Sequence, residues 1–155
     1  MKHDLRAIAN QFAIVGDFTG AEPYGTGHIN DTFVSNFDQG GAHVRYIHQR
    51  INHNVFKQPD VVMTNIERVL AHLHRKLRES GEKQIHRKAL TIIPARDGRT
   101  WHRDADGNTW RTYVFVEGAV THDVIGSPEM AYQAARAFGH FQGLLADLPQ
   151  PRLAE

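Results

Sequence analysis

The sequence of 155 residues contains no cysteine. A disulfide scaffold, a thiolate metal site and a cysteine nucleophile are therefore excluded. No apolar run reaches membrane-spanning length, and the N-terminus lacks the unbroken apolar stretch of a signal peptide. The formal net charge of +1 is no signature of a protein that binds nucleic acid or an anionic membrane. We therefore expect a soluble, cytoplasmic protein that binds neither.

The spacing of the apolar residues alternates between helical and strand periods along the chain. It predicts a helix over residues 4–14, strands over 17–24, 29–37 and 43–51, and a long helix from Pro59 to Gly81. Strands over 90–94 and 110–117 follow, with hairpin turns at 97–98 and 106–107, and a helix begins at Ser127. This order predicts an α+β fold with one antiparallel sheet of about five strands covered by helices.

A glycine-containing segment, Tyr24 to Asn30, separates the first two predicted strands. Glycine allows the main chain to approach a ligand closely, so backbone N–H groups here can lie over phosphates. The segment is not a P-loop, because no Gly-Lys-Ser/Thr follows and no helix begins there. Taken alone, the segment is more typical of an ordinary hairpin turn.

The third predicted strand carries Ile47 and Gln49 on one face and Arg50 on the other, because side chains alternate along a strand. Glu67 lies at the edge of the apolar stripe of the long helix, where its carboxylate points either at the sheet or into solvent. The strand ending at Gly118 leaves abruptly into a loop, where free backbone groups can bind the edge of an adenine ring. A core strand followed by a turn explains that segment as well.

The eleven histidines raise the question of a metal site. No His-x-x-x-His or His-Glu-x-x-His spacing occurs, and Gly-x-Ser-x-Gly is absent. A small α+β domain that binds metal through its histidines is therefore a weak hypothesis for the function of this chain, weaker than the two described below. We expect no metal site in this chain.

Five segments in this order resemble the protein-kinase-like fold of the aminoglycoside phosphotransferase family, and most of all its N-acetylhexosamine kinase-like members. The segments that carry the resemblance are 22–30, 46–52, 65–67, 110–118 and 137–142. The resemblance implies a nucleotide-binding small lobe over residues 1–117. Residues 118–155 would then form the exit from the hinge and the start of a helical catalytic lobe.

The resemblance also implies a role in ATP binding for particular residues. The nucleotide loop over the phosphates would consist of Gly25, Thr26, Gly27, His28 and Asn30. Asn30 stands where kinases have a third glycine, and asparagine accepts the left-handed backbone conformation. Thr32 and Ile47 would line the adenine site.

The remaining implied contacts come from three elements. Gln49 stands where kinases place the lysine that contacts the α and β phosphates, and Glu67 where the helix glutamate pairs with that lysine. Phe115, Val116 and Glu117 would form the hinge that reads adenine.

No segment matches the family's catalytic loop, His-x-Asp with a later Asn, or the aspartate that follows it. Those groups supply the base and the Mg²⁺ ligands. We therefore expect no catalytic residue in this chain, and we expect a truncated small-molecule kinase that is inactive alone. The intact enzyme would use ATP and Mg²⁺ to phosphorylate a hydroxyl of a sugar or aminosugar.

The alternative from another class is a non-catalytic binding or interaction module. The last predicted helix carries Phe138 and Phe141 on its apolar face, which needs a surface to pack against. In this hypothesis the helix docks a partner chain, and it also favours self-association.

Overall fold

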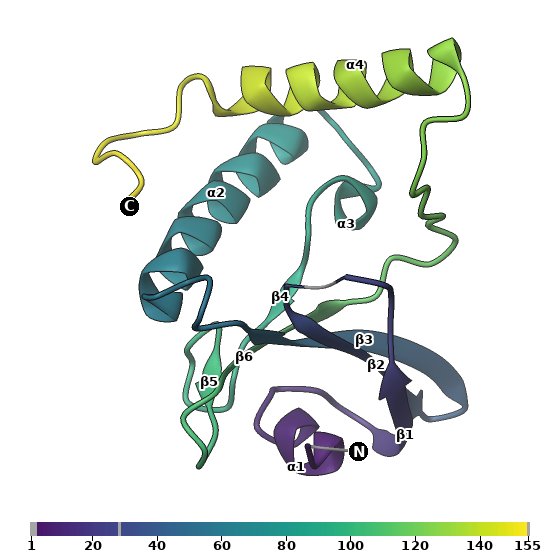
Figure 1. Cartoon of the computed structure of the whole chain (residues 1–155), viewed down its shortest axis with the longest axis vertical. Coiled ribbons are helices and arrows are strands. Elements are labelled where there is room, and N and C mark those ends of the chain that lie inside the picture. The colour runs from purple at the N-terminus through teal and green to yellow at the C-terminus, as the bar shows by residue number, and fades with distance from the viewer. Residues whose placement is uncertain (1–2, 28, 155) are drawn as a thin grey trace.

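The computed structural model describes residues 3–27 and 29–154, which form four helices and six strands. In chain order the elements are α1 (Leu5–Ala9), β1 (Asp17–Pro23), β2 (Asp31–Gln39), β3 (Ala42–Ile51), α2 (Pro59–Glu79), α3 (Ile85–Lys88), β4 (Ile92–Ile93), β5 (His102–Arg103), β6 (Thr109–Val114) and α4 (Pro128–Leu145). Figure 1 shows α1 against one face of the sheet, with α2, α3 and α4 on its other side. The predicted α+β class is confirmed.

The sheet is antiparallel throughout and has the strand order β1-β2-β3-β6-β4. Two hairpins join β1, β2 and β3, and the chain then builds α2 and α3 before β6 returns beside β3. The sixth strand, β5, pairs with β6 through His102 and Trp110. The sequence analysis expected about five strands, because a strand as short as β5 has no periodicity to detect.

The main core lies between α1 and the sheet. Its buried residues are Leu5, Ile8, Ala9, Phe12, Ile14, Phe37, Tyr46, Ala95 and Trp110. The Asp4 carboxylate caps α1 by accepting a hydrogen bond from Ala7 N at 3.0 Å. The helix ends at Ala9 instead of residue 14, because Phe12 forms a β-bridge with Ala95 that holds the backbone extended.

The helices on the other side form a smaller core, in which Leu73 and Leu77 of α2 pack with Ala89 and with the C-terminal end of α4. Ser127 caps α4 as expected, accepting from Met130 N at 3.1 Å. The apolar face of α4 is not buried, contrary to its pattern: Phe138 is 67% exposed. Only the end of α4 near Leu144 and Leu145 packs against this core.

Candidate functional site

A hydrogen-bonded row of polar side chains crosses three strands on the sheet face opposite α1. Thr32, Gln49 and Arg111 are register partners on β2, β3 and β6. Gln49 Nε2 donates to Thr32 Oγ1 at 2.9 Å, and Gln49 Oε1 accepts from Arg111 Nε at 3.0 Å and from Nη2 at 2.6 Å. We call these three residues the polar row. Both ends of the Gln49 amide are used, which determines its orientation.

An apolar row lies beside the polar row, two residues away from it on each strand. Val34, Ile47 and Tyr113 are register partners there, and the first two are buried. Tyr24, which precedes the first glycine of the β1–β2 loop, meets the Phe115 ring edge-on with 5.3 Å between ring centroids. The loop therefore reaches the segment after β6 through Tyr24, a residue to which the sequence analysis assigned no role.

The predicted hinge follows β6, which ends at Val114 and not at residue 117. Phe115 N donates to Arg45 O at 3.1 Å, and the Arg45 guanidinium lies over the Phe115 ring, 3.9 Å from its centroid. Arg45 Nε also donates to Glu117 Oε1 at 2.9 Å, and this hydrogen bond lowers the pKa of the Glu117 carboxyl. Arg87 Nη1 binds the Glu117 carbonyl at 2.7 Å. These contacts hold the segment in one conformation.

The same segment keeps backbone donors available for a ligand. Within residues 3–27 and 29–154, the N–H groups of Val116 and Glu117 donate no hydrogen bond. An adenine edge offers ring-nitrogen acceptors for such donors.

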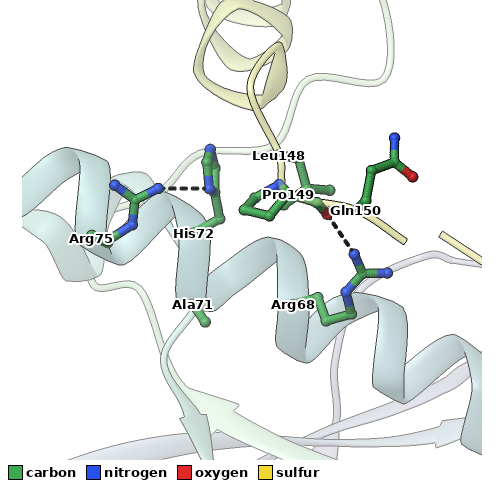
Figure 2. A pocket seen from close by; sticks show the side chains of 7 residues that line it. All are labelled: Arg68, Ala71, His72, Arg75, Leu148, Pro149 and Gln150. Atoms are coloured by element: carbon green, nitrogen blue, oxygen red, sulfur yellow. Dashed lines mark hydrogen bonds between the residues drawn. The ribbon is translucent and has the colours of Figure 1, made fainter. Parts of the chain in front are cut away.

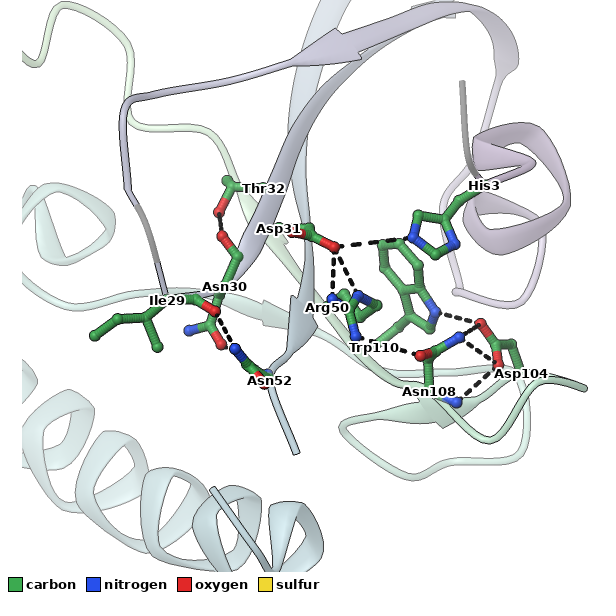
Figure 3. A network of polar contacts seen from close by, with 10 residues as sticks. All are labelled: His3, Ile29, Asn30, Asp31, Thr32, Arg50, Asn52, Asp104, Asn108 and Trp110. Atoms are coloured by element: carbon green, nitrogen blue, oxygen red, sulfur yellow. Dashed lines mark hydrogen bonds and ion pairs between the residues drawn. The ribbon is translucent and has the colours of Figure 1, made fainter. Parts of the chain in front are cut away.

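The backbone of the β1–β2 loop is open to a ligand. Gly25 has a φ of +80°, and a Cβ added at Gly25 or Gly27 would meet nothing within 4 Å. Asn30 does not adopt the left-handed conformation expected for it, since no described residue other than glycine has a positive φ. Its side chain instead accepts from Asn52 N at 2.9 Å, while Asn52 Nδ2 donates to the Ile29 carbonyl at 2.9 Å (Figure 3). Of this loop, His28 lies outside the described residues.

Glu67 does not reach the polar row. Its carboxylate accepts a hydrogen bond from the Thr100 hydroxyl, in the connection between β4 and β5. Arg50 lies on the α1 face, as strand alternation predicted, and donates to Asp31 Oδ2 at 2.8 Å (Figure 3). The cation beside Gln49 is therefore Arg111, which the sequence analysis missed because the register of β3 against β6 cannot be read from one sequence.

A cavity of about 440 Å³ lies against α2, and its other walls come from residues 88–90, from Arg111 of β6, from Phe141 of α4 and from Leu153. Most of the lining is apolar: Ile66, Val69, Leu70, Leu73, Leu90 and Phe141. Two other polar residues line it, and both have partners. Lys88 Nζ pairs with Glu82 Oε2 at 2.6 Å, and Asn65 exchanges two hydrogen bonds with the backbone of Ala154.

A second cavity of about 370 Å³ is lined by Arg68, His72 and Arg75 of α2 (Figure 2). Its cations are already engaged. Arg68 donates to the carbonyls of Pro149 at 2.8 Å and Arg152 at 3.2 Å, and Arg75 to Glu79 at 3.1 Å. The chain's own C-terminal segment thus forms one wall of this pocket and occupies the donors of Arg68, and we do not regard the pocket as a ligand site.

In the part of the chain that the structure describes, no three His, Asp or Glu side chains gather in a group that could hold a metal ion. Among the same residues, no helix combines the length and the apolar character needed to cross a membrane. In a comparison with protein families, the chain matches none of them.

Proposed function

We propose that this chain is the ATP-binding part of a small-molecule kinase, which transfers the γ-phosphoryl group of ATP to a hydroxyl of a sugar or aminosugar. One observation carries the proposal. The polar row, the apolar row and the hinge segment lie side by side on one sheet face, with the open glycine loop at one end.

In this proposal each part of ATP has a matching surface. The adenine ring lies against Tyr24, above the buried Ile47, with its edge toward the free N–H groups of Val116 and Glu117. The phosphates lie under the backbone of Gly25 to Asn30, because glycine permits a close approach. Thr32 and Gln49 line the path between these two ends. A role for Glu67 remains a prediction, since its carboxylate binds Thr100.

Phosphoryl transfer also needs a base and Mg²⁺ ligands, since catalysis of this reaction rests on positioning and charge neutralisation. We propose that the intact enzyme supplies them outside this chain, together with most contacts to the acceptor. The chain alone then binds ATP without transferring its γ-phosphoryl group.

A thermal-shift titration with ATP, with and without Mg²⁺, tests the proposal. ATP at about 100 times its Kd should stabilise the fold by about 2.7 kcal/mol and raise the melting temperature by roughly 5–10 °C. Gly27→Val should abolish the shift, because the new side chain would occupy the path of the phosphates while meeting no protein atom at its Cβ. Gly126→Val, equally open, is the matched control that keeps the shift. A cooperative melt that ATP does not move refutes the proposal.

A second candidate function, an interaction module, rests on α4. Along this fully described helix no residue is buried, and Tyr132 and Phe138 are 61% and 67% exposed. Such aromatic exposure is typical of a docking surface. If α4 docks a second copy, sedimentation should show a dimer that grows with concentration and that Phe138→Ser removes. A monomer at all concentrations speaks against self-association.

A further inference from the structure

Arg111 is a half-buried cation near the candidate site that has no anionic partner among the described residues, whereas Arg87, which binds only the Glu117 carbonyl, is exposed to solvent. Arg45, on the same sheet face, is paired with the Glu117 carboxylate, and Lys88, in the same cavity wall, with Glu82. Arg111 forms no ion pair with any described carboxylate, and its hydrogen bonds go to a neutral amide. Burial lowers the pKa of Arg111, although an arginine stays charged in proteins. A half-buried cation without a counter-ion is unfavourable unless an anion binds it.

The geometry leaves part of the Arg111 guanidinium free for a ligand. Nε and Nη2 donate to Gln49 Oε1, whereas Nη1 has no acceptor among the described residues. The Arg111 side chain is part of the wall of the 440 Å³ cavity. The planar fork of a guanidinium matches two oxygens of a phosphate, and the apolar walls strengthen such an interaction by lowering the local dielectric constant.

We propose that Arg111 binds the phosphates of the nucleotide, with Gln49 as the residue that positions its guanidinium; this inference rests on the proposed function. Gln49 stands at the lysine position of kinases, yet its neutral amide cannot neutralise phosphate. It accepts from Arg111 with its oxygen and donates to Thr32 with its nitrogen. In this proposal the cation beside the phosphates comes from β6 and its positioning partner from β3.

The pairing explains why glutamine suits this position. A lysine side chain carries three donors and no acceptor, so it could not hold Arg111. It would also place a second cation beside the first, and like charges at that distance repel each other. If lysine were the better residue here, Gln49→Lys would improve ATP binding. The arrangement around Arg111 requires the opposite.

Calorimetric titration of the 155-residue chain with adenosine, ATP and inorganic tripolyphosphate tests this inference. Arg111→Met should weaken ATP and tripolyphosphate at least about 10-fold, as expected for the loss of a charge-assisted bidentate contact, and leave adenosine within about twofold. Its melting temperature should equal or exceed that of the unsubstituted chain, because an unpaired buried charge is gone. Gln49→Lys should also weaken ATP. Arg136→Met, an exposed arginine on α4, is the charge-matched control and should change none of these affinities.

The outcomes separate this inference from the proposed function. If the unsubstituted chain binds ATP and Arg111→Met binds it equally well, or if Gln49→Lys binds it more tightly, Arg111 is not the phosphate ligand and the proposed function stands. If tripolyphosphate binds through Arg111 but neither adenosine nor ATP binds, the anion site stands and the proposed function is wrong. If no ligand binds the unsubstituted chain, both are wrong. Should Arg111→Met fail to fold, Gln49→Lys and Arg111→Lys decide by the same affinities.

Discussion

His48 makes the stability of this fold depend on pH. Its side chain is fully buried on the α1 face, where Nε2 lies 2.7 Å from Ser35 Oγ and Nδ1 lies 2.7 Å from Thr112 Oγ1. Both partners are neutral hydroxyls, and the nearest ring is that of Phe12. Burial therefore lowers the pKa of His48 from 6.5 to about 4. The imidazole is neutral in the folded state over the whole range in which it titrates in the unfolded chain.

The sign of the effect follows from proton counting. Between pH 6.5 and about 4 the unfolded chain holds a proton on His48 that the folded chain does not, so stability falls as the pH falls through this window. The full loss is about 3 kcal/mol, at roughly 1.4 kcal/mol for each pH unit between the two pKa values. Between about pH 7.5 and about pH 5 it amounts to about 2 kcal/mol.

Urea unfolding at these two pH values measures the effect. His48→Gln keeps a donor and an acceptor for Ser35 and Thr112 but cannot titrate, so it should lose about 2 kcal/mol less than the unsubstituted chain on acidification. Carboxylates contribute equally to both proteins and cancel in the comparison. His43→Gln, an exposed histidine on the same strand, should keep the full pH dependence. An equal loss in His48→Gln and the unsubstituted chain refutes the argument.

Two further predictions concern the backbone. Gly16→Ala should destabilise the fold by at least about 2 kcal/mol in urea unfolding, because φ is +97° and the new Cβ would lie 2.3 Å from Asp38 O. The control Gly126→Ala, whose Cβ would lie in open space, should change stability by less than about 0.5 kcal/mol. Equal destabilisation by the two substitutions would contradict this explanation. Arg68→Met should expose the Ala154 amide to rapid hydrogen exchange, since Arg68 holds the carbonyls of this segment; unchanged protection would show that Asn65 alone holds it.

Local sequence signals predicted much of the fold. Proline placement located the start of α2, and the Ser127 cap together with Pro128 located the start of α4, because both signals act within one helical turn. Strand alternation placed Ile47 and Gln49 on one face of β3 and Arg50 on the other, since the backbone geometry of a strand imposes that period. A competing long-range contact and the shortness of two elements explain the errors. The Phe12 bridge to Ala95 shortens α1, and the short α3 and β5 carry too few residues for a periodic pattern.

The sequence by itself determined the α+β class, the order of most elements and the residues that share a face of each strand, because these depend on neighbours in the chain. Only the tertiary structure decided which strands meet. The pairing of β3 with β6 places Arg111 against Gln49, and the position of α2 turns Glu67 toward Thr100. Tyr24 meets Phe115 for the same reason. Such contacts depend on register and packing between segments distant in the chain, which no local pattern specifies.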